Sequence, residues 1–186
     1  ASTWLIQRFA TFPPPKGLRN PDIVVEQRGE RLWLDVAGDR VEAWYLPPRT
    51  APPKTPLVIY SHGNVELIDN RAAEFGELRD AGIGMLLVEY PGYGRSEGYP
   101  SEASVTAALV AAFDWAAADP RIDARRIAGY GRSLGGGAIA QLAARRPLAA
   151  LVLESTFANF EDVVMHFGVP RALLINHFDT RAVLEK

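Results

Sequence analysis

The residues around Ser133 have the types and the spacing of a nucleophilic serine. They read Gly131-Arg132-Ser133-Leu134-Gly135, between a short apolar run and a segment that continues as a helix. On such a strand-to-helix turn the residues two before and two after the serine have almost no room for a Cβ, and glycine stands at both places. The start of the following helix favours negative charge developing near the hydroxyl. The pattern predicts that Ser133 is a nucleophile held at positive φ; the alternative is a glycine-rich turn without chemistry.

A second motif, Ser61-His62-Gly63-Asn64, ends an earlier apolar run. Acyl transfer needs two backbone N–H donors for the oxyanion, and a glycine at a strand end lets the backbone turn an amide into the site. The natural donors are the amides of Leu134, directly after the nucleophile, and Asn64, with Val65 as the second choice for the latter. His62 is predicted to hydrogen-bond the loop backbone and hold the turn; the role of catalytic base is the less favoured alternative.

Four apolar runs carry these motifs at their ends and alternate with segments of helical spacing. They lack polar alternation, which is typical of strands buried on both faces of a parallel sheet. Two earlier strands are joined by a hairpin-like link and are predicted to be antiparallel. The fold class is therefore α/β: a mostly parallel sheet, helices on both faces and an antiparallel hairpin at the start. Ligands of such sheets bind beyond the carboxyl ends of the strands. The hairpin strands are 31–36 and 41–46, the apolar strands 57–60, 84–88, 126–130 and 150–153, and the helices 67–82, 101–118 (N-cap Ser101) and from the Ser133 motif to about 145.

The composition excludes several classes of function. Twenty basic against 22 acidic residues give a net charge of −2, which excludes a strongly basic nucleic-acid surface. Cysteine is absent, which excludes a disulfide scaffold, a cysteine nucleophile and a thiolate metal site. Three scattered histidines do not indicate a metal site, and no apolar run is long enough to span a membrane. We expect a domain without metal or organic cofactor that acts on a small molecule.

The chain resembles the α/β-hydrolases, in particular the branch similar to small serine aminopeptidases and esterases. Members carry H-G-N after the third strand, Y-x-G-x-G-x-S-x-G after the fourth and G-x-S-x-G-G after the fifth. The counterparts here are His62-Gly63-Asn64, the stretch 90–98 and the stretch 131–136, in the same order. The resemblance covers about Ile23 to Thr180. It implies a serine hydrolase of carboxyl esters, or of thioesters or amides, that forms an acyl-enzyme on Ser133.

The resemblance further implies a triad whose Asp follows the seventh strand and whose His follows the eighth. The sequence ends at Lys186, before either strand, so we expect an incomplete hydrolase domain over 22–186 and little turnover by this chain alone. Glu154 is a backup triad acid, because some α/β-hydrolases carry the acid at that strand end, although hydrogen bonding that orders loops is the favoured role. His166, His177 and Asp179 are expected to be ordinary helix or loop residues.

The two ends of the chain also carry expectations. Residues 1–21 are expected to form an extended segment, similar to the one that follows a signal or membrane anchor in some relatives. The chain begins at Ala1, so its compartment stays open between cytoplasmic and exported or membrane-anchored. Near the other end, the run Ala150-Leu151-Val152-Leu153 is expected to leave one side of its backbone unpaired, which predicts self-association through that edge.

Two other classes of function stay open as alternatives. Gly135, Gly137 and Ala140 match a G-x-G-x-x-A dinucleotide fingerprint, with Glu154 closing the next strand. In that fold the first glycine follows its strand directly, whereas Gly135 is expected inside a helix. The second alternative is a non-catalytic binding module on a hydrolase scaffold. A nucleotide that copurifies with the protein would favour the first alternative, and a Ser133 that fails to react would favour the second.

Overall fold

A computed structural model describes residues 12, 15, 20, 22–50, 53–161, 165 and 176–185. The expected extended segment 1–21 therefore lies almost entirely outside the described residues, and so does His166. In the described part of the chain, no helix is long and apolar enough to cross a membrane.

The described strands form one six-stranded sheet in the order β1-β2-β4-β3-β5-β6. The first two strands pair antiparallel as a hairpin, and β2 joins β4 antiparallel. The other neighbours, β4 with β3, β3 with β5 and β5 with β6, are parallel. The predicted fold class is confirmed. The strands are β1 (Glu30–Val36), β2 (Asp39–Leu46), β3 (Thr55–Ser61), β4 (Gly84–Val88), β5 (Ile122–Arg132) and β6 (Leu151–Glu154).

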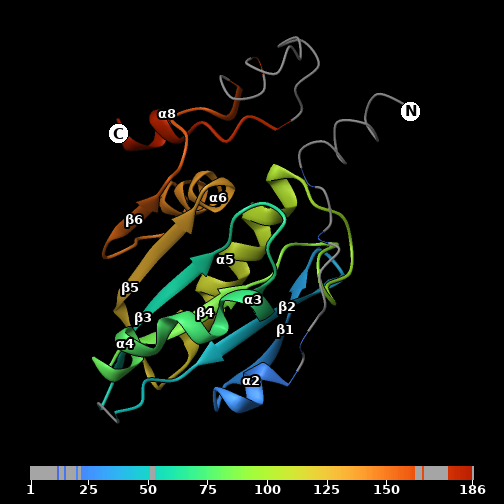
Figure 1. Ribbon diagram of the computed structural model, residues 1–186. Helices are drawn as coiled ribbons and strands as arrows, with labels where there is room; N and C mark the ends of the chain where they lie inside the picture. The colour runs from blue at the N-terminus through green and yellow to red at the C-terminus, as the bar shows by residue number, and fades with distance from the viewer. Residues whose placement is uncertain are drawn as a thin grey trace.

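Helices cover both faces of the sheet. In Figure 1, α3 and α4 lie in front of the sheet and α5 lies behind it, with α6 beginning where the arrow of β5 ends. Next to α6, α8 lies beyond this end of the sheet. The helical segments are α2 (Ile23–Glu26), α3 (Ile68–Arg71), the 3-10 helix η1 (Ala72–Phe75), α4 (Gly76–Asp80), α5 (Glu102–Ala118), α6 (Leu134–Ala143) and α8 (Thr180–Leu184).

The buried strand β3 separates two hydrophobic cores. Leu57 and Ile59 belong to the core that contains α5 and α6, whereas Tyr60 belongs to the core formed with α3 and η1. Successive side chains of a strand point to opposite faces, so an uninterrupted apolar run serves both cores at once. This is the reason that the run 57–60 shows no polar alternation.

The helix α5 agrees with its prediction, and the expected helix 67–82 differs in detail. The Ser101 hydroxyl caps α5 by accepting a hydrogen bond from the Ser104 amide at 3.0 Å. The segment 68–80 is instead broken into α3, η1 and α4. A 3-10 turn places side chains three apart on one face, which brings Ala72 and Phe75 together onto the sheet.

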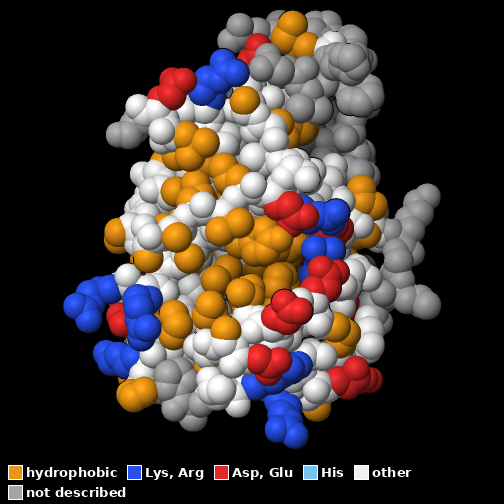
Figure 2. Space-filling model, turned by 60° about the vertical axis from the view of Figure 1, so that its left-hand side comes forward, with side chains coloured by type: hydrophobic (Ala, Val, Ile, Leu, Met, Phe, Trp, Pro, Cys, Tyr) orange, Lys and Arg blue, Asp and Glu red, His pale blue; other side chains and the backbone are white. Residues whose placement is uncertain are grey.

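The strand β6 lies at the edge of the described sheet, where only β5 pairs with it. Val152 is 51% exposed, so one face of this strand presents an apolar side chain at the surface. Val152 is the register partner of Tyr130, which in turn pairs with Tyr60, so the three side chains share one face. In Figure 2 the side of the molecule that carries β6 in Figure 1 comes forward, and hydrophobic side chains gather on this face. Leu151 and Leu153 instead pack against the core beneath α5 and α6.

Candidate functional site

Ser133 lies on the turn between β5 and α6. It is the N-cap of α6 with φ 53° and ψ −118°, so the expected positive φ is confirmed. The turn is possible because of the flanking glycines. A Cβ on Gly131 would meet the carbonyl of Gly135, and a Cβ on Gly135 would meet the carbonyl of Ser61. The N-terminus of α6 therefore packs directly on the end of β3, and Ser133 stands exposed above it.

The backbone of Ser133 is fixed from two sides. Its amide donates to the carbonyl of Glu154 at 2.8 Å, which ties the turn to the end of β6. Its carbonyl accepts from the Gly136 amide at 2.9 Å and from the Thr156 hydroxyl at 2.8 Å. These hydrogen bonds hold a backbone conformation that a residue with a Cβ rarely adopts.

The two expected oxyanion donors lie at the ends of neighbouring strands. Leu134 is the first residue of α6, where the helix leaves its amide without an intrahelical acceptor. Asn64 follows β3, and its Oδ1 accepts from the Tyr93 hydroxyl at 3.0 Å and from the Val65 amide at 3.1 Å. The Val65 amide is thus engaged with the Asn64 side chain, and the choice of Asn64 as the second donor stays a prediction.

His62 is buried and engaged at both ring nitrogens. Nδ1 lies 2.8 Å from the carbonyl of Gly63, and Nε2 lies 2.8 Å from Oε1 of Glu89. Burial by itself lowers the pKa of His62, but the Glu89 carboxylate and the hydrogen bonds to Glu89 and Gly63 raise this pKa overall. The prediction that His62 holds the loop backbone is confirmed, and the geometry gives no support to a role as base toward Ser133.

Glu154 lies beside the turn, at the end of β6. Its carboxylate accepts from the Tyr130 hydroxyl and lies 3.2 Å from Nε of Arg132. Burial and the Glu154 carboxylate raise the pKa of Tyr130 to about 12, so the phenol remains a donor at neutral pH. Glu154 is therefore placed to order the turn, which was the favoured prediction. The structure does not test its role as backup acid.

The described contacts of His177 and Asp179 do not involve Ser133. His177 is exposed, and its Nδ1 lies 4.0 Å from the Glu161 carboxylate. Asp179 caps α8 by accepting from the Ala182 amide at 3.0 Å. No hydrogen bond joins the Ser133 hydroxyl to any residue that the structure describes.

Sequence reasoning missed the ion pairs that hold the loop after β4. Arg95 donates to Glu42 at 2.7 Å and to both oxygens of Asp69 at 2.9 Å. Both carboxylates are buried, and Glu42 also lies 3.0 Å from Nε of Arg31. Arg95 lies in the glycine-rich stretch 90–98, but its partners are 53 and 26 residues away, so no local pattern indicates them.

The structure also bears on the alternatives of metal and nucleotide binding. Across the described ranges, no group of three or more potential ligands is arranged to hold a metal ion. Gly135 and Gly137 lie within α6, where a Cβ on Gly137 would meet Phe157 and Phe178. These glycines serve helix packing, and their backbone does not form the open loop that a pyrophosphate requires.

No protein-family model matches the chain. An uncharacterized protein of Mycobacterium tuberculosis is 36% identical over 160 residues, which are 84% of this chain and 54% of that protein. The alpha/beta hydrolase domain-containing protein WAV2 of Arabidopsis thaliana is 32% identical over 139 residues, 72% of this chain and 44% of that protein. The lysophosphatidylserine lipase ABHD12 of Xenopus tropicalis is 32% identical over 138 residues, 70% of this chain and 34% of that protein.

Solved structures agree on the fold. An α/β hydrolase of Vibrio vulnificus superposes with a TM-score of 0.77 at 19% identity, over 97% of this chain and 71% of that chain. Together with the sheet order and the turn at Ser133, these likenesses define the class: the chain belongs to the α/β-hydrolase superfamily. It spans about half the length of the first curated relatives that it matches.

Proposed function

We propose that the protein hydrolyses carboxyl esters through an acyl-enzyme on Ser133. The observation that carries the proposal is the backbone of Ser133, at φ 53° and ψ −118° on an exposed strand-to-helix turn. Strained positions of this kind persist only where the surrounding structure enforces them, and they cluster at active sites. The likeness to a protein named a lysophosphatidylserine lipase supports an ester substrate.

In this mechanism the Ser133 hydroxyl oxygen attacks the carbonyl carbon of the ester, and its proton passes to a general base. The amides of Leu134 and Asn64 donate to the oxyanion that forms. When the tetrahedral intermediate collapses, the C–O bond breaks and the alcohol leaves with the proton. Water then attacks the acyl-enzyme in the same way, which releases the acid and returns the proton to Ser133.

The general base is the component that the described residues do not supply. His62 is committed to Glu89 and the loop backbone, and His177 is exposed beside Glu161. A serine hydroxyl without a base stays protonated and reacts slowly. We therefore expect the 186-residue chain alone to turn over esters slowly. The same observation favours the second candidate function, a non-catalytic binding module.

A mechanism-based label distinguishes the two functions. The protein is incubated with a fluorophosphonate, which reacts with activated serines, and its hydrolysis of a p-nitrophenyl ester is measured. We expect labelling and turnover to disappear in Ser133→Ala and to persist in Ser155→Ala, an exposed serine 22 residues further along the chain. In a form of the protein that hydrolyses the ester above background, equal turnover in wild type and Ser133→Ala would refute the acyl-enzyme.

The same measurement on a longer form of the protein tests whether the general base lies outside these 186 residues. The 186-residue chain is assayed beside a longer form that includes counterparts of the parts of its relatives that lie outside the matched region. Labelling of Ser133 in the longer form alone would mean that the base comes from outside these residues. Labelling in neither form, with the fold intact by circular dichroism, would support the binding module instead.

A further inference from the structure

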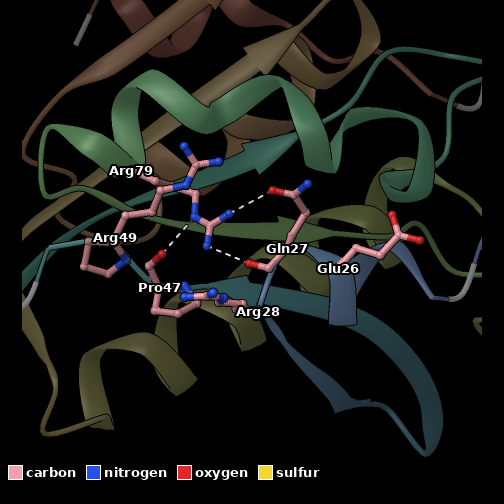
Figure 3. A pocket seen from close by; sticks show the side chains of 7 residues that line it. Glu26, Gln27, Arg28, Pro47, Arg49 and Arg79 are labelled. Atoms are coloured by element: carbon pink, nitrogen blue, oxygen red, sulfur yellow. Dashed lines mark hydrogen bonds between the residues drawn. The ribbon is translucent and has the colours of Figure 1, made fainter.

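A buried arginine near the end of the sheet where the parallel strands begin donates its hydrogen bonds to neutral groups alone. Arg79 is 3% exposed, and its guanidinium donates to the carbonyl of Pro47 at 2.8 Å and to the side chain and carbonyl of Gln27 at 3.0 and 2.7 Å. Figure 3 shows these hydrogen bonds converging on the guanidinium. Buried charges in proteins are ordinarily paired with an opposite charge, and no described carboxylate forms an ion pair with Arg79.

Two further arginines line the same cleft. Arg28 and Arg49 join Arg79, Gln27, Pro47 and Pro48 around a cavity of about 470 Å³. Burial and the positive charge of Arg49 lower the pKa of Arg79, and the Asp80 carboxylate offsets part of this change. Arg49 also forms an ion pair with Asp80, in which Nη1 of Arg49 lies 3.1 Å from each carboxylate oxygen.

The acidic residues do not neutralise the cleft. Asp80 is engaged by Arg49, and the Glu26 carboxylate points away from the three guanidinium groups in Figure 3. Arg28 completes the wall from a left-handed backbone conformation, φ 53°, at the end of α2. The cleft therefore presents an excess of positive charge beside the apolar rings of Pro47 and Pro48.

The cleft is separate from the Ser133 site. Leu46, directly before Pro47, pairs with Met85 at the start of β4, whereas Ser133 follows the end of β5. Since β4, β3 and β5 run parallel, all three strands begin at one end of the sheet and finish at the other. The cleft therefore lies near the end where they begin, and Ser133 lies at the end where they finish. An occupant of the cleft does not compete with a substrate at Ser133.

We propose that this cleft binds the phosphate group of a small organic phosphate, with Arg28, Arg49 and Arg79 on the phosphate and the two prolines against its carbon skeleton. Guanidinium groups match phosphate oxygens in both charge and geometry. An anion bound there would supply a directly paired opposite charge, which Arg79 does not have among the described residues. The proposal is independent of the chemistry at Ser133.

The test is binding of phosphate compounds, measured by calorimetry at constant ionic strength. The probes are inorganic phosphate and glycerol 3-phosphate. The test variant is Arg28→Gln with Arg49→Gln, which leaves Arg79 and its hydrogen bonds in place. The control variant is Arg125→Gln with Arg126→Gln, two exposed arginines that change the net charge equally. We expect the test variant to bind at least about tenfold more weakly and the control to bind as wild type does.

Each outcome decides the proposal. Tighter binding of glycerol 3-phosphate than of inorganic phosphate would identify an organic phosphate as the ligand, and equal affinity would identify the free ion. No binding by wild type, or an equal loss in the control variant, would overturn the site and reduce the effect to general charge. If the double variant unfolds, the single Arg28→Gln replaces it, because the Arg28 side chain is exposed and makes no described ion pair.

Discussion

The guanidinium of Arg132 contacts the carboxylate of Glu66, and this ion pair joins the turn of Ser133 to the loop of Asn64. The other oxygen of Glu66 accepts from the Gly63 amide at 2.9 Å, directly before Asn64. On its other side Arg132 lies 3.2 Å from Glu154 at the end of β6. One charged network thus fixes both proposed oxyanion donors relative to the serine between them.

We predict that Glu66 and Arg132 position the site as a unit. Glu66→Gln and Arg132→Gln should each lower kcat about ten- to a hundredfold with little change in KM, less than the loss of a whole oxyanion donor. The double variant should be no slower than either single variant, because both remove the same link. The kinetics are measured in the form of the protein that hydrolyses esters.

The surface pair Asp114 and Arg146, at 2.7 Å, provides the control. Asp114→Asn with Arg146→Gln should leave kcat unchanged. Amide hydrogen exchange at Gly63 gives a second readout, which should accelerate in Arg132→Gln whether or not the protein is an esterase. Additive kinetic losses with unchanged exchange would refute the positioning role.

Gly135 should be intolerant of a side chain. A Cβ there would lie against the carbonyls of Ser61 and His62, and backbone cannot move aside as a flexible side chain can. We expect Gly135→Ala to lower the free energy of unfolding by about 1–3 kcal/mol or more, as overpacking does. Gly76→Ala is the control, since its Cβ would lie 3.5 Å from a side-chain atom of Arg49, an ordinary contact. Urea titrations of both variants measure the difference, and equal stability would contradict the close packing of α6 on β3.

The His62–Glu89 pair should make stability depend on pH. Since the pKa of His62 is raised in the folded state, the stabilisation is complete below the unfolded value of about 6.5 and is lost as pH rises through the folded value. Each unit of pKa shift corresponds to about 1.4 kcal/mol. The free energy of unfolding of wild type should therefore fall as pH rises above about 6.5.

The variant His62→Gln should lose this part of the pH dependence. His177→Gln is its control, because the His177 side chain is exposed. Urea titrations at pH values from below to well above the unfolded value of about 6.5 measure the change. A wild-type curve parallel to that of His62→Gln would show that folding does not change the pKa of His62, and wild-type stability that instead rises with pH up to about 6.5 would show that the buried histidine stays neutral.

Self-association through β6 remains a prediction. In the described sheet, only β5 pairs with β6, and Val152 adds an exposed apolar side chain to that edge. Exposed edges of this kind pair with other chains. We expect concentration-dependent dimers by light scattering, weakened in Val152→Lys and unchanged in Val25→Lys, whose valine is 71% exposed on α2. A monomer at every concentration would refute the prediction.

Local pattern was sufficient for the features that local physics determines. The apolar runs predicted the parallel strands, Ser101 predicted the start of α5, and two glycines predicted the backbone of Ser133. The ion pairs could not be predicted from local sequence, because Arg132 and Glu66 are 66 residues apart and come into contact only when β3 and β5 pair.

The buried set of Glu42, Asp69 and Arg95 also limits how this chain can diverge over time. Replacing one member leaves an uncompensated buried charge, at a cost of about 3–5 kcal/mol, whereas replacing all of them with well-packed apolar residues is close to neutral. Single steps between the two arrangements therefore pass through an unstable intermediate. Homologous sequences should consequently carry these three residues together or lack them together. Positions in β2, in α3 and in the loop after β4 should therefore covary.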